Sequence, residues 1–241
     1  MTHLHPDTDW LTDYAAGTLD DAHALCVATH LEHCPVCRAD VKNLASIGGA
    51  MLNALGTTSV ETPVAADADN KDVYQIDELL IEKTLKQLDT ETQTTPPDTG
   101  RLEPTAESEN VPLPAAFRKL APNGLESLNW KSFGKNLHVA DLDRIDDKRE
   151  VALQKLEPGS AVAHHDHRGR EITVVLTGSF SDSNGQYYPG DFIVKEPGEK
   201  HRPTASENTP CVCLSVTDAP VRFTGMLTRL LNPIISYRHP G

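Results

Sequence analysis

The first part of this chain is organised by one short stretch, His30-Leu31-Glu32-His33-Cys34-Pro35-Val36-Cys37. It reads His-x3-Cys-x2-Cys, and the spacing of four places His30 and Cys34 on one face of a helix. Pro35 suits the first turn of a following helix, which makes Cys34 its expected N-cap, where backbone N–H groups favour a thiolate. A helix end, a tight turn and a helix start should therefore bring His30, Cys34 and Cys37 to one point.

Thiolates and imidazoles are zinc ligands, and a structural zinc ion takes four ligands in a tetrahedron. Spacing alone leaves the fourth ligand open, with four candidates: His5, His3, Cys26 and His33. Cys26 lies one helical turn before His30, whereas His5 lies just ahead of a separate amphipathic segment. The alternative is that the cysteines are ordinary buried or redox-active thiols and His30 is a core histidine. We favour zinc because Cys-x2-Cys behind a helically phased histidine is a specific ligand geometry.

Three helices are predicted in residues 1–56, from apolar residues at helical spacing. The first should end near Gly17, and the second should begin after Thr18. The third should run from Pro35 to near Gly56. So few residues bury little apolar surface, and a domain of this size usually needs a metal or a disulfide to fold. This need is a second reason to expect zinc.

Acidic residues are concentrated in the first half of the chain. The 241 residues carry a formal net charge of −13. Residues 1–56 hold 7 acids and 2 bases, residues 57–111 hold 13 and 4, and residues 112–241 hold 15 and 16. An acidic chain is unsuited to nonspecific binding of nucleic acid or of an anionic membrane, but it can bind a basic protein partner. We therefore expect no direct contact with nucleic acid and no membrane association.

Compartment can be inferred from the cysteines and from the apolar runs. No run reaches membrane-spanning length, and the N-terminus lacks the basic start and apolar segment of a signal peptide. Three of the five cysteines lie in or near the metal-like stretch, which fits ligand thiols in a reducing compartment. We expect a soluble, cytoplasmic protein.

The middle of the chain is predicted to contain one helix between two linkers. Residues 57–72 are rich in Thr, Ala and Asp, and residues 89–111 combine prolines with several acids. Between them, residues 73–88 place their apolar side chains along one helical face. This helix either packs on its own neighbours or docks on a partner. We therefore divide the chain into a helical zinc-binding domain at 1–90, an acidic linker at 91–111 and a second domain at 112–241.

The last part of the chain has the pattern of an antiparallel β-protein. Short alternating or β-branched runs occur at residues 151–156, 172–176, 191–194 and 211–216. Turn-forming pairs separate them: Pro158-Gly159, Asn184-Gly185, Pro189-Gly190 and Pro197-Gly198. Many short strands with regular turns favour a sandwich or a barrel.

A second set of metal-binding residues lies inside this β region. It reads Gly159-x5-His165-x-His167-x3-Glu171-x6-Gly178, followed by Gly190-x10-His201. On a strand His165 and His167 point to one face, and His164 points to the other. Three imidazoles and one carboxylate that converge in a barrel make a divalent transition-metal site. The alternative is a loop of surface histidines, which we disfavour because four residues match two linked spacings.

This block closely resembles both signature motifs of the cupin family. The resemblance implies a small antiparallel β-barrel, a jelly roll, that holds His165, His167, Glu171 and His201 around one metal ion. The ion would be zinc or, alternatively, manganese, iron or nickel. The expected fold is therefore α+β with two domains, a small zinc-stapled helical bundle followed by a cupin barrel.

The two domains together resemble the ChrR type of zinc-binding anti-sigma factor, from the segment Leu11-Thr12-x-Tyr14-Ala15-Ala16-Gly17-Thr18-Leu19 through the cupin motifs. The resemblance implies that zinc is bound by His5, His30, Cys34 and Cys37. It also implies that the N-terminal domain sequesters an ECF (group IV) sigma factor, and that the cupin is needed to release it on exposure to singlet oxygen or organic peroxide.

The family pattern also includes a Cys-x-Cys in the cupin, here Cys211 and Cys213. On a strand both thiols face one side, as a redox pair or as core residues, and we favour core.

Two other functions fit parts of the pattern. One is a metal-dependent cupin enzyme, dioxygenase-like, with a zinc-binding regulatory domain, because a site of three histidines and one glutamate with an open position supports oxygen chemistry. The nearest candidates for an acid or a base are Tyr187, Tyr188 and Arg170, and they form no distinctive catalytic set. The other is a metal-bound sensor of a small molecule. We favour a regulator without turnover, with at most weak self-association through the cupin.

Overall fold

The computed structural model describes residues 4–54, 115–117, 121, 123–142, 145–146, 148–219 and 221–223. The predicted helix at 73–88 and both predicted linkers lie outside these residues. The helices and strands described below belong to one compact unit of the chain. Among the helices that the structure describes, none combines the length and the apolar composition that a membrane span requires.

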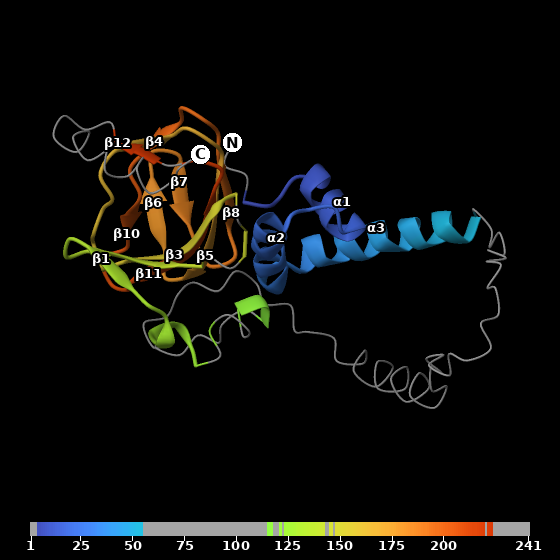
Figure 1. Cartoon of the computed structure of the whole chain (residues 1–241), viewed down its shortest axis with the longest axis horizontal. Helices are drawn as coiled ribbons and strands as arrows, with labels where there is room; N and C mark the ends of the chain where they lie inside the picture. Colours follow the sequence, from blue (N-terminus) through green and yellow to red (C-terminus); the bar gives the residue numbers. More distant parts are fainter. Residues whose placement is uncertain are drawn as a thin grey trace, which may run out of the picture. The chain divides into compact units, whose positions relative to one another are not determined.

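The N-terminal part contains the three expected helices: α1 (Thr8–Ala16), α2 (Asp21–His33) and α3 (Pro35–Ala54). Helix α1 ends where predicted, because Gly17 adopts a left-handed conformation (φ 69°) and its N–H bonds to the Tyr14 carbonyl. Helix α3 runs on beyond α1 and α2 (Figure 1), and Cys37 is its only buried residue.

The predicted start of the second helix was wrong by two residues. The N-cap of α2 is Asp20, whose carboxylate accepts a hydrogen bond from the His23 N–H at 3.1 Å. Thr18 cannot fill this role because its hydroxyl donates to the Asp13 carbonyl of the preceding helix. Two capping residues in close succession made the boundary ambiguous in the sequence.

Twelve strands follow in the described part of the chain (Figure 1). Six of them form one antiparallel sheet in the order β1-β2-β3-β11-β5-β8, and two three-stranded sheets have the orders β10-β6-β7 and β12-β4-β9. The strands are β1 (Lys131–Phe133), β2 (Leu137–Asp141), β3 (Glu150–Leu156), β4 (His165–His167), β5 (Glu171–Thr177), β6 (Phe180–Asp182), β7 (Gly185–Tyr187), β8 (Phe192–Lys195), β9 (Lys200–His201), β10 (Thr204–Ala205), β11 (Cys211–Thr217) and β12 (Val221–Phe223). Short 3-10 helices precede them at Ala115–Phe117 and Leu125–Ser127.

The four predicted strands are all present, as β3, β5, β8 and β11, with ends that move by one residue. Their near-continuous apolar character is explained by burial of the large sheet on both faces. On one face, Ile172, Val174 and Leu214 share a core with apolar residues of α1 and α2. On the opposite face, Val175 and Cys213 belong to a second core. The helical region and the barrel thus share one apolar core, and α2 packs along β5, β8 and β11.

Candidate metal centres

The structure brings together the four residues of the expected N-terminal site. His5 precedes α1, His30 lies in the last turn of α2, Cys34 joins α2 to α3, and Cys37 lies in the first turn of α3. One ligand atom from each residue lies within 4.8 Å of the others. His5 is the exposed member, and the other three are buried.

The distances among these atoms fit a tetrahedral zinc ion. The Nδ1 atom of His5 lies 3.4 Å from His30 Nε2, 3.4 Å from Cys34 Sγ and 3.6 Å from Cys37 Sγ. Nitrogen and sulfur ligands of a tetrahedral zinc are roughly 3.3–3.8 Å apart, given ordinary Zn–N and Zn–S bond lengths. The two histidines would therefore bind through different ring nitrogens, Nδ1 for His5 and Nε2 for His30.

A backbone carbonyl of the barrel orients His30. Its Nδ1 donates to the Gly190 carbonyl at 2.6 Å, which leaves Nε2 as the atom with a free lone pair. Burial lowers the pKa of His30 to about 4, so the ring is neutral, as a metal ligand must be. Gly190 is needed at this turn because its φ is +89° and a Cβ there would lie 2.4 Å from the Cβ of His33.

The environment of the two thiols is suited to binding a cation. Burial, together with the neighbouring Cys34 sulfur, raises the pKa of Cys37 to about 12, so this thiol ionises only next to a positive charge. The Cys37 N–H points at Cys34 Sγ at 3.4 Å, which is the N-cap arrangement expected for Cys34. The chemistry of the donor set therefore matches zinc.

Of the other candidates for the fourth ligand, none described by the structure joins the cluster. Cys26 is fully buried in the apolar core, where burial raises the pKa of its thiol. His33 lies against the Gly190 turn instead, and His3 lies outside the described residues. Among the candidates that the structure describes, His5 is therefore the one that joins the cluster.

The four residues of the expected barrel site also converge. His165 and His167 come from β4, Glu171 opens β5, and His201 ends β9, directly opposite His165 in the strand register. His201 Nε2 lies 2.9 Å from His165 Nε2, 3.0 Å from His167 Nε2 and 3.7 Å from Glu171 Oε2. Donor atoms about 2.1 Å from one ion lie roughly 3.0–3.4 Å apart, so this cluster also has the size of a metal site.

Burial and neighbouring charges set the protonation of the barrel cluster. Burial, with the nearby His201 ring, lowers the pKa of His165 to about 4, and its Nδ1 donates to the Ala163 carbonyl. Burial alone would raise the pKa of Glu171, but the three histidines and a hydrogen bond from the Ser215 hydroxyl hold it below its usual range. Three imidazoles and a carboxylate form a donor set for a divalent transition metal. His164 precedes β4, is exposed and lies outside the cluster.

Cys211 and Cys213 face the same side of β11, as their spacing predicts. Their sulfur atoms lie 3.6 Å apart, and both side chains are buried among apolar residues of the second core. The contact with Cys211, together with burial, raises the pKa of Cys213 well above that of a free thiol. The structure places this pair in the core rather than at an accessible surface.

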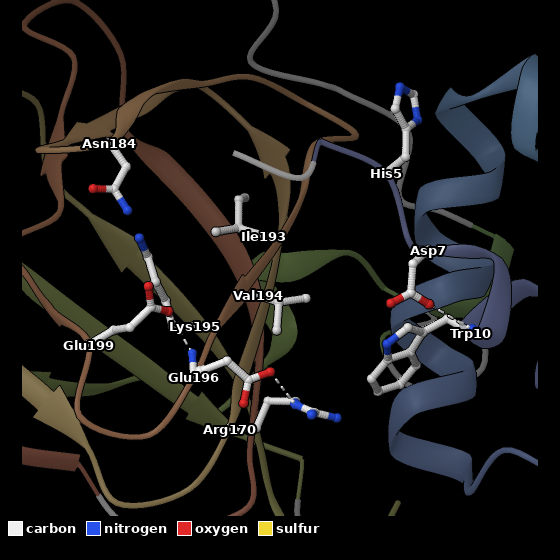
Figure 2. Close-up of a pocket in the computed structure, with 10 residues that line it drawn as sticks. All are labelled: His5, Asp7, Trp10, Arg170, Asn184, Ile193, Val194, Lys195, Glu196 and Glu199. Atoms are coloured by element: carbon white, nitrogen blue, oxygen red, sulfur yellow. Dashed lines mark hydrogen bonds and ion pairs between the residues drawn. The ribbon is translucent and has the colours of Figure 1, made fainter. Parts of the chain in front are cut away.

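A cavity of about 630 Å³ lies beside β8 (Figure 2). Its lining includes His5 and Trp10 from the N-terminal region, and Arg170 and Lys195 from the barrel. Arg170 forms an ion pair with Glu196 and lies over the Trp10 ring. Both contacts are structural, and neither points to a catalytic role for Arg170. Tyr187 donates its hydroxyl to Asp182, so it too is structurally engaged.

The residues that support the ligands were missed by the sequence analysis. They are Gly190 behind His30, Ser215 behind Glu171, and Asp182 with Lys195 behind His201. The sequence did indicate a turn at Gly190, because it forms the turn pair Pro189-Gly190. A serine on a strand, or an aspartate and a lysine thirteen residues apart, gives no sign that it will meet a metal ligand.

Comparison with known proteins identifies both parts of the chain. The family model of the ChrR cupin-like domain matches residues 124–220, and a zinc-finger family model matches residues 8–38. The anti-sigma-E factor ChrR of Cereibacter sphaeroides is 33% identical over 234 residues, which cover 97% of this chain and 98% of that protein.

A solved structure agrees with this relationship over both parts. It is the crystal structure of Rhodobacter sphaeroides SigE in complex with the anti-sigma ChrR, with 29% identity and a TM-score of 0.61. The match covers 89% of this chain and 98% of the chain in that structure. Both matches extend along nearly the whole chain, and the chain belongs to the ChrR family of anti-sigma factors.

Proposed function

We propose that this protein is an anti-sigma factor that binds a sigma factor of the sigma-E type and keeps it from RNA polymerase. The observation that carries the proposal is the 33% identity with anti-sigma-E factor ChrR, which extends over 97% of the chain and so includes both metal-binding regions. Regulation of this kind works by stoichiometric binding and needs no turnover. We further propose that the partner belongs to the ECF (group IV) class.

Helix α3 offers a surface on which such a partner can dock. Its apolar side chains at Val36, Ile47, Met51 and Leu52 are 58–72% exposed. Exposed apolar side chains along a helix are typical of a partner-binding face, because an amphipathic helix buries them in a hydrophobic groove. Residues 1–56 carry 7 acids and 2 bases, so the same region would complement the basic, nucleic-acid-binding side of a sigma factor.

We propose that zinc at His5, His30, Cys34 and Cys37 gives this docking surface its shape. When bound, the ion would fix the angle between α2 and α3 and tie the segment before α1 to both. The residues themselves prepare the site: Gly190 orients His30, and the N-terminus of α3 presents its amide to Cys34. We also propose the domain division predicted from the sequence: a zinc-binding helical domain at 1–90, an acidic linker at 91–111 and a cupin barrel at 112–241.

We also propose that the barrel cluster serves release of the sigma factor on exposure to singlet oxygen or organic peroxide. The structure supplies contacts through which a change in the barrel would reach the helices. His30 is held by the Gly190 carbonyl, and Arg149 of the barrel binds Asp20, the N-cap of α2. The Phe192 ring, at the start of β8, lies 6.0 Å from the His30 ring.

The test is transcription in vitro with a sigma factor of the sigma-E type from the same organism. Titration of the zinc-loaded full chain should stop sigma-dependent transcription at about one chain per sigma factor, as stoichiometric binding requires. Transcription with the housekeeping sigma factor serves as the control and should continue. Unchanged sigma-dependent transcription at a large excess of the chain would contradict the proposal.

A further inference from the structure

We propose that Asp182, anchored by Lys195, is the positioning residue that holds His201 for the metal of the barrel site. The proposal rests on the proposed metal site at His165, His167, Glu171 and His201. It adds a second layer of residues, which do not bind the metal but determine how one of its ligands is oriented and which ring nitrogen carries the proton.

Asp182 is built into the barrel as a buried hydrogen-bond acceptor. It ends β6, and its side chain is 0% exposed. Its carboxylate accepts from the Tyr187 hydroxyl at 2.9 Å and from the Asn184 N–H at 2.8 Å.

The His201 ring lies between this carboxylate and the ligand cluster. Its Nδ1 faces Asp182 Oδ2 at 3.4 Å, while its Nε2 lies 2.9 Å from His165 Nε2 on the other side. A carboxylate beside Nδ1 keeps the proton on that nitrogen and leaves the lone pair of Nε2 for the metal. The same contact fixes the ring plane and strengthens the imidazole as a donor.

Lys195 stabilises the charge on Asp182. Its ammonium lies 3.0 Å from Asp182 Oδ2, and the two side chains are 5% and 0% exposed. Placing two charges out of water is costly, so a buried pair of this kind is a weak source of stability. A structural role alone therefore accounts poorly for this pair, whereas a role in holding the Asp182 carboxylate beside a metal ligand accounts for both residues. Lys195 is the last residue of β8, the edge strand of the large sheet, and it contacts Asp182 from there. It also lines the cavity beside β8 (Figure 2).

His201 differs from the other ligands because its outer partner is a carboxylate. His165 donates to a neutral backbone carbonyl, that of Ala163, and Glu171 accepts from the neutral Ser215 hydroxyl. The Nδ1 atom of His167 is buried without a hydrogen-bond partner among the described residues. The carboxylate behind His201 is thus the contact whose loss should weaken metal binding most.

The test measures metal affinity in the full-length protein with both sites occupied at the start. Competition with a chromogenic chelator separates the two metals by strength, and cobalt substitution gives each site its own absorption spectrum, because thiolates are ligands only in the N-terminal cluster. Asp182→Asn should weaken metal binding in the barrel by roughly 10–100-fold, the usual effect of losing an outer partner of a ligating histidine. Asp182→Ala should weaken it at least as much, and the N-terminal affinity should not change.

Two further variants show whether the effect is specific. Glu199→Gln removes a carboxylate two residues from His201 that accepts a backbone hydrogen bond from Glu196, and it should leave the affinity unchanged. Lys195→Met leaves the Asp182 charge without its cation and should shift the barrel cobalt spectrum. Circular dichroism establishes that each variant is folded.

Three results would overturn the inference. Folded Asp182→Asn and Asp182→Ala proteins that bind the barrel metal as tightly as wild type would remove the positioning role and leave the metal site intact. A Glu199→Gln loss as large as that of Asp182→Asn would mean that only the net charge matters. A wild-type protein without a barrel metal would overturn the site itself, and the proposed sigma binding is assessed separately by the transcription assay.

Discussion

The two candidate metal centres differ in how the chain builds them. The helical cluster takes three of its four ligands from the eight residues His30–Cys37, and its fourth, His5, is exposed. The barrel cluster takes its ligands from three strands in two sheets, and all four are buried. In the first, the ligands meet because a helix ends and another begins. In the second, they meet because an already closed barrel holds them.

This difference predicts different roles for the two metals. Around the helical cluster, α3 has a single buried residue, and Val41 and Leu44 pack on the core only in part, so we expect the metal to hold much of the position of this helix. Around the barrel cluster, the sheets have an apolar core of their own. The helical metal should therefore be part of the fold, and the barrel metal should be a ligand of a fold that exists without it.

The largest effect is expected from Cys34→Ala in the full-length protein. Loss of one thiolate should release the N-terminal metal and disorder the packing of α1, α2 and α3, because metal binding and folding are coupled there. Elemental analysis and the helical signal in circular dichroism measure the two losses. Cys26→Ala is the matched control and should retain the metal, since Cys26 lies in the apolar core outside the cluster. A metal-free Cys34→Ala protein with its full helical signal would contradict the structural role.

A smaller effect on folding is expected from Glu171→Gln. This variant should lose the barrel metal and keep the barrel, with a decrease in stability of about 3 kcal/mol if metal is supplied at 100 times its Kd. Thermal unfolding with and without added metal measures the difference. Unfolding of the barrel in this variant would show that the barrel, like the helical region, needs its metal to fold.

The same variant addresses the proposed signal. Glu171→Gln should repress transcription like wild type before stress, and it should release the sigma factor less well after singlet oxygen or peroxide. A reporter gene under control of the sigma factor measures both states. A normal response would place the sensor elsewhere and make Cys26, Cys34 and Cys37 the next residues to replace.

His5→Ala should have a milder effect than Cys34→Ala. His5 is the exposed ligand and comes from outside the helical hairpin, so two thiolates and His30 remain and water can take the fourth position. We expect weaker zinc binding with recovery of the helical signal at high zinc, which a zinc titration followed by circular dichroism measures. Zinc affinity equal to wild type would exclude His5 as the fourth ligand.

The smallest effect is expected where the helical region meets the barrel. Arg149 contacts Asp20 at the start of α2 and also binds Asp146 and Asp218 in the barrel. These ion pairs are partly exposed, so Arg149→Met should lower the free energy of unfolding by about 1 kcal/mol, and less at high salt. Urea unfolding measures this, with Lys131→Met as the control, because the Lys131–Asp141 pair lies within the barrel. Equal salt dependence of the two variants would mean that Arg149 does not stabilise the contact between α2 and the barrel more than an ion pair within the barrel does.

What the sequence predicted follows the same division between local and distant contacts. The ligands His30, Cys34 and Cys37 were predictable because helical geometry links neighbours in the chain, and His165 and His167 because a strand has a period of two. His5 remained one of four candidates, since only tertiary packing brings the segment before α1 to the end of α2. His201 was grouped with the other three ligands because two linked spacings match, and the cupin resemblance then implied that all four surround one metal ion.

The residues that support the ligands could not be predicted from the sequence, because only tertiary packing brings them to the ligands. Asp182 and Lys195 become partners only when β6 and β8 are placed around the barrel, and Gly190 meets His30 across 160 residues of sequence. The start of α2 was misplaced because Thr18 and Asp20 are both competent caps, and the choice depends on Thr18 bonding back to α1. Packing of α2 on β5 has no signal in either segment alone.

The central claim is that the chain sequesters a sigma factor through the helical centre and responds through the barrel centre. Size-exclusion chromatography with light scattering, on the full chain mixed with its sigma factor, tests it most directly. Wild type and Glu171→Gln should elute with the sigma factor as a stoichiometric complex, and Cys34→Ala should elute apart from it. A complex with metal-free Cys34→Ala, or no complex with Glu171→Gln that is folded and loaded at the helical centre, would contradict sequestration through the helical centre.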